Sequence, residues 1–363
     1  MNIFMALKNK MQAVVCHGPS DYRLEHVDTP KIGPGDILVE VGACGVCASD
    51  VKCYHGAPSL WGGENPYVKP PVIPGHEFIG TVVELSPEAE ETGIKIGDKA
   101  IAEQIFPCHN CRFCKSGKYW MCERNYVFGF QGGYDDGGFA EYMKYPAGSI
   151  VHMVPKEVPD EFAVMIEPLS CAIHAVQRAR IELGDVAVIA GMGPLGLCML
   201  QVAKMRSPGK LVALDLREER LNLAEKLGAD MVVNVAKEDA VKTVKQVTGG
   251  YGCDVYIEAT GHSSAVTQGL EMLRKLGRMV VFGVFKEPAT ADWSIIGDRK
   301  ELDVYGSHLG PYCYPLAIDY ISTGKVKVDR IVTHKFPLSE FKKAFEYSEK
   351  GLDGAIKVVL VPP

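Results

Sequence analysis

The strongest constraint on the fold is a strand-like run, a glycine-rich turn and a helix-like run that follow one another in residues 185–206, DVAVIAGMGPLGLCMLQVAKMR. Further strand-like runs follow it, and helix-like runs separate them; they are KLVALDL (210–216), MVVNV (231–235), CDVYIEATG (253–261) and RMVVFGV (278–284). Strands that alternate with helices pack as a parallel sheet with helices on both faces. The sequence therefore predicts a doubly wound α/β unit.

The glycines of the turn have the spacing G-x-G-x-x-G, at Gly191, Gly193 and Gly196. The pattern alone is weak evidence, but here it follows a predicted strand and opens a predicted helix. The first glycine permits a tight turn, the second lets the backbone approach a pyrophosphate, and the third lets helix and strand pack closely. The helix N-terminus then meets the phosphate charge, so we expect a dinucleotide here.

The next predicted strand ends at Asp215, roughly twenty residues further on, where an acid accepts hydrogen bonds from a ribose diol. A carboxylate there repels a 2′-phosphate, which favours NAD over NADP. Arg217 and Arg220 complicate this interpretation, because an arginine can flank an adenine ring or bind a 2′-phosphate. Both arginines can equally be solvated charges on a helix.

The first hundred residues have a different texture, with short β-like runs broken by Gly and Pro, such as MQAVVCHG (11–18), DILVEVGACG (36–45) and EFIGTVVELS (77–86). Period-2 or continuous apolar character of this kind predicts strands in a mostly antiparallel unit. A chain of 363 residues is long enough for two domains. We therefore expect an α/β protein with a second, mostly β domain.

Four of the twelve cysteines lie within PCHNCRFCKSGKYWMC (107–122), at Cys108, Cys111, Cys114 and Cys122. Four thiolates at this spacing can surround a tetrahedral Zn²⁺, and a shell closed by four sulfurs leaves no position for substrate. An iron–sulfur cluster is the alternative, but its usual last spacing is shorter and a proline follows it. The segment has few basic residues, which argues against a nucleic-acid finger. We expect a structural zinc.

A second, scattered set combines different donors: Cys44 and Cys47 in GACGVCASD, His76 and Glu77 in PGHEFIG, and Glu167 in MIEPLSCAIHA. Each residue alone has an ordinary explanation; a lone histidine is usually no ligand, and an acid before proline can cap a helix. Together they offer a thiolate, an imidazole and one or two carboxylates. Such a mixed set suits a catalytic zinc with an open position.

Composition limits the partners. The formal net charge is -6, so no overall basic field points to nucleic acid. No apolar run reaches 18 residues, and the N-terminal MNIFMALKNK has no long apolar core or cleavage site, so we expect neither a membrane span nor a secretory signal. A cytoplasmic enzyme with a small-molecule substrate fits these features.

These motifs, with GGFAEY and the terminal THKFPLSEFKKAF, lead to a family. The chain after Met11 resembles the zinc-dependent medium-chain dehydrogenases/reductases, especially their sorbitol and threonine dehydrogenase-like branch. The resemblance implies a GroES-like, mostly β catalytic domain (11–165 and 300–363, with the zinc lobe at about 107–123). It also implies a Rossmann NAD-binding domain (166–299), two zinc ions per chain, and a homodimer or homotetramer.

The resemblance also implies roles. The catalytic cysteine is Cys47, which stands in CASD, rather than Cys44; His76 is a second ligand, and either Glu77 or Glu167 completes the shell. Ser49 matches the hydroxyl of the proton relay. The implied cofactor-binding residues are Gly191, Gly193, Leu195, Gly196, Asp215, Arg220, Phe282, Gly283 and Val284.

Two departures from the family concern the substrate. Lys52 occupies the place of a relay histidine, with His55 nearby, and Leu309–Gly310 replace an Arg-Tyr pair of the polyol branch. We therefore expect NAD-dependent, reversible oxidation of a primary or secondary hydroxyl of a small polyol, from tetritol to hexitol, to the ketose or aldose. The alternatives are a threonine- or simple-alcohol-specific dehydrogenase, and a zinc- and nucleotide-binding protein without catalysis.

Overall fold

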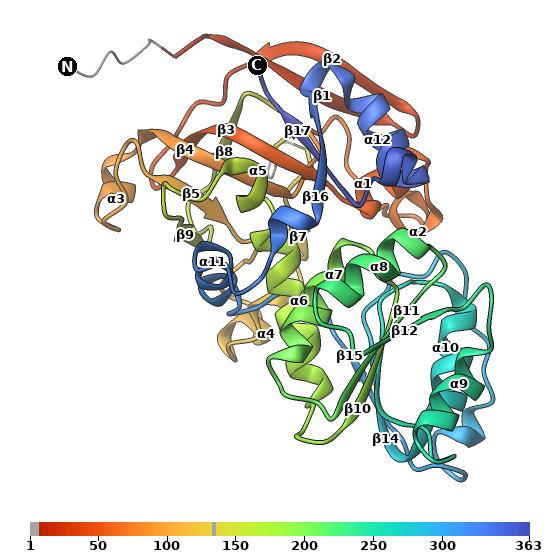
Figure 1. Cartoon of the computed structure of the whole chain (residues 1–363). Helices are drawn as coiled ribbons and strands as arrows, with labels where there is room; N and C mark the ends of the chain where they lie inside the picture. Colours follow the sequence, from red (N-terminus) through yellow and green to blue (C-terminus); the bar gives the residue numbers. More distant parts are fainter. Residues whose placement is uncertain (1–6, 133–135) are drawn as a thin grey trace. The chain divides into compact units, whose positions relative to one another are not determined.

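The computed structural model describes residues 7–132 and 136–363 and divides the chain into two compact units. The first unit combines the chain up to Glu167 with Val332–Pro363, and the second is Pro168–Ile331. The chain thus leaves the first unit once and returns to it for its last strands (Figure 1). Among the described residues, no helix combines the length and the apolar character that crossing a bilayer requires.

A seven-stranded sheet forms the centre of the first unit, in the order β16-β17-β3-β4-β5-β9, with β8 also paired to β3. Its strands are antiparallel to their neighbours except for the parallel pair β16–β17. The strands are β3 (Ile37–Val46), β4 (Glu77–Leu85), β5 (Lys99–Ala102), β8 (Tyr142–Tyr145), β9 (Val151–Met153), β16 (Val332–Pro337) and β17 (Lys357–Val361). Strand β3 is buried along most of its length, which explains its nearly continuous apolar sequence.

Smaller elements surround this sheet. Two antiparallel pairs of strands lie outside it: β1 (Lys10–Gly18) with β2 (Asp21–Asp28), and β6 (Ile105–Phe106) with β7 (Tyr126–Val127). The short helix α5 packs on β3 and β4, and α12 packs on β16 and β17. The helices are α1 (Ala48–Tyr54), α2 (Pro58–Trp61), α3 (Pro87–Glu90), α4 (Arg112–Lys115), α5 (Asp160–Ala163) and α12 (Phe341–Lys350).

The second unit is built on a six-stranded, wholly parallel sheet in the order β12-β11-β10-β13-β14-β15. The strands are β10 (Val186–Ala190), β11 (Lys210–Asp215), β12 (Met231–Asn234), β13 (Cys253–Glu258), β14 (Leu273–Val281) and β15 (Asp303–Gly306). Its core includes the fully buried Val188, Val212 and Tyr256.

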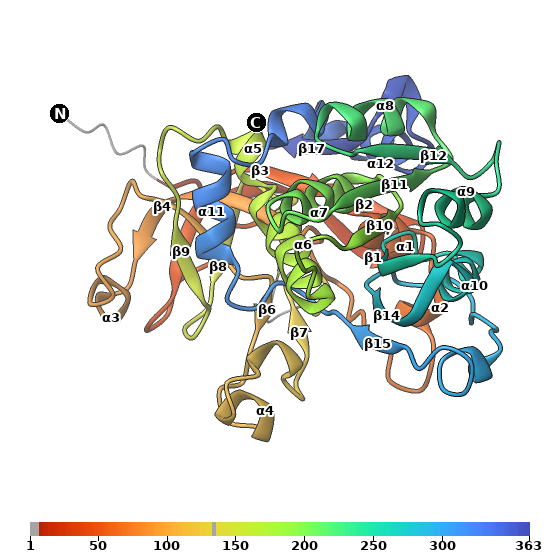
Figure 2. The ribbon, with the colours of Figure 1, turned by 60° about the horizontal axis from the view of Figure 1, so that its bottom comes forward.

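Helices cover both faces of this sheet. In Figure 1, α7 lies on one side, and α9 and α10, which contact each other, lie on the other. The helices that begin in or belong to this unit are α6 (Ile166–Ala179), α7 (Pro194–Lys204), α8 (Glu218–Lys226), α9 (Ala240–Val247), α10 (Ser263–Met272) and α11 (Tyr314–Ser322), of which α11 does not cover the sheet; Figure 2 shows them from a second direction. The doubly wound architecture expected from the alternating texture is confirmed.

The domain boundary differs from the expectation at the point where the chain returns from the second unit to the first. The family resemblance placed the return to the first domain at residue 300, whereas residues 300–331 belong to the second unit. The reason is β15, which pairs in parallel with β14 and forms the sixth strand of the sheet. With four residues, mostly exposed, β15 lacks the apolar run that marks the other strands.

Candidate active site and metal centres

Three potential metal ligands meet where β3 and β4 pair. Cys47 follows β3 and caps the N-terminus of α1, His76 immediately precedes β4, and Glu77 is its first residue. The antiparallel register sets Gly45 opposite Glu77, which brings the two strand ends together. One donor atom from each of the three ligand residues lies within 4.8 Å of the other two.

This donor set fits a catalytic zinc. Sulfur, nitrogen and oxygen donors converge, and His76 and Glu77 are buried with exposed fractions of 8% and 2%. Three protein ligands leave the fourth position of a tetrahedral zinc available for substrate. Ser49, predicted as the relay hydroxyl, has its Oγ 3.4 Å from Nε2 of His76 and so lies beside this set.

Asp50 contacts two of the candidate metal ligands, His76 and Cys47. It was not predicted as a site residue from the sequence. It is 1% exposed; its Oδ1 lies 3.4 Å from His76 Nδ1, and its Oδ2 accepts a hydrogen bond from the Cys47 amide at 2.8 Å. Burial alone lowers the pKa of His76, but the charges of Asp50 and Cys47 outweigh it and raise that pKa. Carboxylates in this position orient metal-ligating histidines. The sequence feature that could have identified Asp50 is its place as the last residue of the CASD motif.

The two glutamates differ in their surroundings. Glu77 forms a buried ion pair with Lys357 of β17. Glu167, near the start of α6, is also buried, and its Oε1 accepts a hydrogen bond from Nε2 of Gln104 at 2.5 Å. The group of donors within 4.8 Å includes Glu77 and does not include Glu167. Lys357 and Gln104 are further neighbours that sequence reasoning missed.

The four clustered cysteines also converge. Donor atoms of Cys108, Cys111, Cys114 and Cys122 all lie within 4.8 Å of one another, around the single turn of α4. Backbone amides of Cys108 and Cys111 point at sulfurs of the cluster, at 3.2 and 3.3 Å. Backbone hydrogen bonds from Cys114 and Glu123 lower the pKa of Cys111 to about 6, which favours its thiolate. Four convergent sulfurs fit a closed, structural zinc.

One buried carboxylate attaches this lobe to the sheet. Glu103, which directly follows β5, is 2% exposed. Its Oε2 accepts a hydrogen bond from the hydroxyl of Tyr119 in the lobe at 2.7 Å, and its Oε1 lies 3.0 Å from Nε2 of His152 on β9. The lobe is therefore held by a specific polar contact as well as by its own cysteines.

The glycine-rich turn of the second unit has the geometry that its spacing predicts. Gly191 has φ +95°, which favours glycine. A Cβ on Gly196 would lie 1.7 Å from the Gly191 carbonyl oxygen, so only glycine permits this approach of α7 to the turn. Gly193 caps the N-terminus of α7, and Leu195 is in its first turn.

This turn borders a cavity of about 530 Å³ within the second unit. Gly191, Gly193, Asp215 and Arg220 line it, so the structure brings these predicted cofactor residues together. Gly193, which lines the cavity, is the N-cap of α7, and a helix N-terminus is suited to a phosphate group.

Asp215 has more partners than the sequence indicated. Its Oδ2 accepts a hydrogen bond from the Met192 amide at 2.6 Å, and its Oδ1 accepts one from the Arg217 amide at 2.9 Å. Nη1 of Arg220 lies 4.0 Å from Oδ2. Burial lowers the pKa of Arg220, and the charge of Asp215 partly opposes this effect. Asp215 therefore orders the glycine-rich turn in addition to facing the cavity.

The predicted nicotinamide contacts lie just beyond β14. The amides of Phe282 and Gly283 donate to the Glu258 carbonyl at 3.0 and 3.2 Å, and Val284 is 64% exposed. A Cβ on Gly283 would lie 2.3 Å from the amide nitrogen of Gly261. None of these three predicted residues lines the 530 Å³ cavity.

The structure also shows the surroundings of the residues at which this chain differs from the family pattern. Lys52 lies in the last turn of α1. His55 follows α1 and is half-exposed, and its Nε2 lies 3.1 Å from Oε2 of Glu349 on α12. Leu309 has φ +55°, and a Cβ on Gly310 would collide with Ser170 on α6. The Leu309–Gly310 turn is therefore held tightly against α6.

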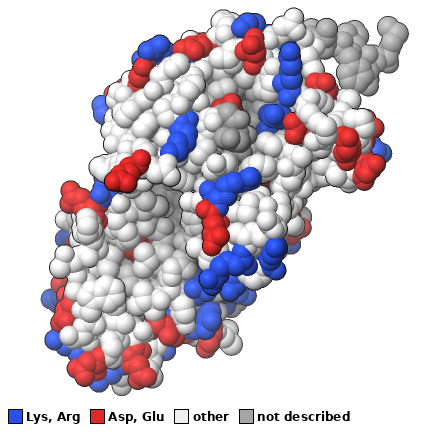
Figure 3. Space-filling view, turned by 180° about the vertical axis from the view of Figure 1, so that it is seen from behind, with Lys and Arg blue, Asp and Glu red and all other residues white. Residues whose placement is uncertain are grey.

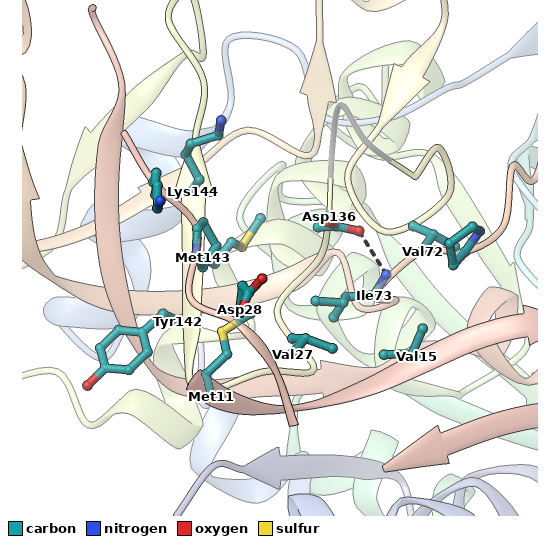
Figure 4. A pocket seen from close by; sticks show the side chains of 13 residues that line it. Met11, Val15, Val27, Asp28, Val72, Ile73, Asp136, Tyr142, Met143 and Lys144 are labelled. Carbon is teal, nitrogen blue, oxygen red and sulfur yellow. Dashed lines mark hydrogen bonds between the residues drawn. The ribbon is translucent and has the colours of Figure 1, made fainter. Parts of the chain in front are cut away.

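A second cavity, of about 390 Å³, lies in the first unit and was not expected from the sequence (Figure 4). Apolar side chains of β1, β2 and β8 line it, together with Asp136, whose Oδ1 accepts a hydrogen bond from the Ile73 amide at 2.9 Å. Burial raises the pKa of Asp136. None of the candidate metal ligands lines this cavity.

Acidic and basic side chains are intermixed on the molecular face seen in Figure 3. This distribution accompanies the small net charge of -6.

A parallel nucleotide-binding sheet and a sulfur, nitrogen and oxygen donor set together define the class of metal-dependent dehydrogenases. Comparison with known families agrees: residues 33–156 match the alcohol dehydrogenase GroES-like domain, and residues 194–323 match the zinc-binding dehydrogenase family. The chain belongs to this family of zinc-dependent dehydrogenases. The expected family, α/β fold and enzyme class are confirmed, as are zinc and a nicotinamide dinucleotide as cofactors.

The chain is similar to several curated proteins over nearly its whole length. It is 54% identical to erythritol/L-threitol dehydrogenase of Mycolicibacterium smegmatis, covering 97% of this chain and 98% of that protein. It is 36% identical to L-threonine 3-dehydrogenase of Pyrococcus furiosus, covering 98% of this chain and 100% of the relative. It is 34% identical to human sorbitol dehydrogenase, covering 98% and 97% respectively.

A solved structure agrees with the fold. The zinc-binding dehydrogenase from Sinorhizobium meliloti bound to NADP superimposes with a TM-score of 0.88 at 29% identity. The match covers 98% of this chain and 100% of that one.

Proposed function

We propose that this chain reversibly oxidises a hydroxyl of a short polyol to the ketose or aldose, with NAD⁺ as the hydride acceptor and a tetritol as the preferred substrate. The observation that carries the proposal is the 54% identity to the erythritol/L-threitol dehydrogenase across nearly all of both chains. The assembled Cys47, His76 and Glu77 donor set supports it, because a non-catalytic relative would not need to keep it.

In this proposal Cys47, His76 and either Glu77 or Glu167 hold the catalytic zinc. When bound, zinc lowers the pKa of a coordinated alcohol and so favours the alkoxide. Asp50 fixes the ring of His76. The hydroxyl of Ser49, beside His76, accepts the substrate proton and passes it toward solvent.

The cofactor is held by the second unit. The amides at the start of α7, with Gly191, Gly193, Leu195 and Gly196, bind the pyrophosphate. Asp215 binds the adenosine ribose and disfavours a 2′-phosphate, while Arg220 flanks the adenine side. Phe282, Gly283 and Val284 form the nicotinamide end. A nicotinamide bound there would supply the acceptor for the hydride of the alcohol substrate.

The second zinc has a structural role. Cys108, Cys111, Cys114 and Cys122 hold it, and the Tyr119–Glu103 contact attaches their lobe to the sheet. We further expect a cytoplasmic homodimer or homotetramer, which fractionation and light scattering of the purified protein would test.

The second candidate is threonine oxidation, favoured by the 36% identity to an L-threonine 3-dehydrogenase over the whole of that relative. Threonine carries an ammonium and a carboxylate, whereas a polyol is neutral. The two candidates therefore differ in the charge that the substrate pocket must accommodate, and a substrate screen separates them.

The decisive experiment is an absorbance screen for NADH with erythritol, D- and L-threitol, xylitol, ribitol, sorbitol, L-threonine and 1-propanol, each with NAD⁺ and NADP⁺. Metal analysis of the same sample accompanies it, and Cys47→Ser is the control for metal-dependent turnover. The highest kcat/KM with a tetritol and NAD⁺ supports the proposal. A higher value with threonine transfers the function to the second candidate. No turnover with any polyol, despite two zincs per chain, contradicts the proposal.

A further inference from the structure

The cavity of about 390 Å³ in the first unit reaches into the core of that unit (Figure 4). Five of the side chains that line it are buried: Met11, Val15, Val72, Ile73 and Met143. Small-molecule sites are usually concave and mostly apolar, with volumes of about 300–1,000 Å³ and a few polar groups that fix the orientation of the ligand. The volume of this cavity lies near the lower end of that range, so it suits a short ligand.

Backbone hydrogen bonds hold the walls of the cavity in place. Cys16 of β1 and Val72 exchange two hydrogen bonds, with N–O distances of 2.8 and 3.2 Å. The Gly137 amide donates to the Ile73 carbonyl at 2.6 Å, which joins the neighbouring wall to the segment that carries Asp136. A cavity whose walls are bonded in this way is already formed before a ligand binds, so little ordering of the chain opposes binding.

One carboxylate of the lining has no cation of its own. Oδ1 of Asp136 accepts a hydrogen bond from the Ile73 amide at 2.9 Å, shown by the dashed line in Figure 4. Burial raises the pKa of Asp136, and the Ile73 amide and the charge of Lys144 oppose this effect only in part. Lys144 instead has its Nζ 3.4 Å from Oδ2 of Asp36. In the part of the chain that the structure describes, no cation forms an ion pair with Asp136.

The other carboxylate of the lining differs from Asp136 in this respect. Oδ1 of Asp28 lies 2.8 Å from Nζ of Lys10. Lys10, and after it Lys31, lower the pKa of Asp28. The negative charge of Asp28 is therefore matched, whereas a buried carboxylate without a cation is costly. A cationic ligand group beside Asp136 would offset that cost.

We propose that this cavity binds an organic ammonium compound with a short apolar chain, whose cationic head pairs with Asp136 and whose chain packs against the apolar lining. The inference goes beyond the proposed function and does not depend on it, because none of the candidate metal ligands lines this cavity. The ammonium head supplies the missing cation, and the chain removes apolar surface from water. A neutral or anionic compound of the same length lacks the first contribution.

The test measures ligand binding to the purified protein by isothermal titration calorimetry near neutral pH, where an alkylamine is protonated. The ligands are n-hexylammonium, n-butylammonium, hexan-1-ol and hexanoate, so that head group and chain length vary separately. Asp136→Asn loses the charge but keeps an oxygen that can accept the Ile73 amide. Val27→Phe places a larger apolar side chain in the cavity from β2. Asp28→Asn is the matched control, because Asp28 also lines the cavity but is paired with Lys10.

We expect n-hexylammonium to bind the wild type at least about tenfold more tightly than hexan-1-ol or hexanoate. Asp136→Asn should weaken its binding by about 10- to 100-fold, the usual contribution of a hydrogen bond to a charged group. Each methylene that enters the cavity should strengthen binding about fourfold, so n-butylammonium should bind about 15-fold more weakly. Val27→Phe should also weaken binding, and Asp28→Asn should bind like the wild type.

Three results would overturn the proposal: no measurable binding of n-hexylammonium, equal affinities of the wild type and Asp136→Asn, or tighter binding of hexanoate than of n-hexylammonium. Amines also bind metal ions, so the titration is repeated with Cys47→Ser. The proposal requires that this variant still binds n-hexylammonium and that adding Asp136→Asn weakens the binding. Loss of binding in Cys47→Ser would place the amine at the metal centre instead. If Val27→Phe does not fold, the comparison of Asp136→Asn with Asp28→Asn still decides the outcome.

The proposed oxidation of a polyol and this binding site are tested separately. None of the titrations contains a polyol or NAD⁺. A protein that binds n-hexylammonium as expected but oxidises no polyol would refute the proposed substrate and leave the cavity assignment standing. The reverse result would refute the cavity assignment alone.

Discussion

Nε2 of Gln104 lies 2.5 Å from Oε1 of Glu167, and both side chains are buried. The preceding residue, Glu103, accepts a hydrogen bond from Tyr119 in the four-cysteine lobe. Two consecutive residues after β5 thus connect the structural lobe on one side and a predicted catalytic carboxylate on the other. The hydrogen bonds of these two residues therefore lie between the lobe and Glu167.

Gln104→Leu should lower kcat/KM by about 10- to 100-fold, because a hydrogen bond to a charged group contributes about 1.5–3 kcal/mol and Glu167 would lose the one that Gln104 donates. Steady-state kinetics measure the effect. Gln201→Leu is the matched control, since Gln201 is also buried but its partners are the Lys327 amide and the Leu197 carbonyl. Equal losses in both variants would show that Gln104 acts only through general stability.

Cys47→Ser should remove one zinc per chain and reduce kcat at least about 100-fold, because Cys47 is the sulfur donor of the mixed ligand set. Metal analysis and kinetics on the same preparation check this prediction. Cys44→Ala is the control, since Cys44 is buried on β3, three residues before Cys47, and lies outside the donor group. Loss of zinc in the Cys44 variant with full activity in the Cys47 variant would reverse the assignment.

Cys111→Ser should lower stability before it lowers activity, because binding free energy at a closed structural zinc site is also folding free energy. We expect a lower Tm and the loss of the second zinc, measured by scanning calorimetry and metal analysis. Light scattering should show impaired assembly as well. A fully assembled variant that lacks this zinc and melts like the wild type would contradict the structural role.

Asp215→Ala should reduce the NAD⁺/NADP⁺ ratio of kcat/KM about tenfold or more, because the role proposed for this carboxylate is to accept hydrogen bonds from the ribose and to repel a 2′-phosphate. The substitution should also raise KM for both cofactors. Asp215 accepts a hydrogen bond from the Met192 amide, and its loss would leave the glycine-rich turn less ordered. Asp215→Asn keeps the shape and an acceptor but loses the charge, so it separates the two effects. An unchanged ratio in both variants would remove Asp215 from cofactor selection.

The stability of the protein should depend on pH through His174. Burial, then the charges of Arg178 and His308, lower the pKa of His174 to about 4. Its ordinary pKa is about 6.5, so between these values the unfolded chain takes up a proton that the folded chain excludes. The free energy of unfolding should therefore fall as the pH drops from about 6.5 to about 4, with no further loss from this group below that.

His174→Gln should flatten this dependence, which urea denaturation at several pH values would show. Metal ligands also gain protons in this range, so the comparison is between wild type and variant after the same chelator treatment. Parallel curves for the two proteins would mean that His174 does not carry the effect.

Local sequence patterns were enough to predict those features that a single short segment of the chain forms. The four cysteines lie within one short segment, so their spacing alone predicted a common site, and their sulfurs converge. Gly191 and Gly196 lie in one turn, where the required backbone geometry follows from the spacing. The family resemblance supplied the pairing of Cys47 with His76. The roles of these residues in binding and catalysis stay predictions.

Other features were decided only by tertiary structure. Strand β15 is too short and too exposed to be recognised, yet its pairing with β14 moves residues 300–331 into the second unit. Asp215 faces the cavity as predicted, but its bonds to the turn were not readable from its position after a strand.

The sequence by itself determined the family, the doubly wound unit, the cysteine cluster and the donor types of the candidate active site, because each depends on short spacings or on motifs. Only the tertiary structure decided that Lys357 faces Glu77 and that Gln104 faces Glu167. In the sequence, Lys357 is one charge in an apolar terminal strand. Its partner depends on the register of β17 with β3 and of β3 with β4, and burial makes that pairing obligatory.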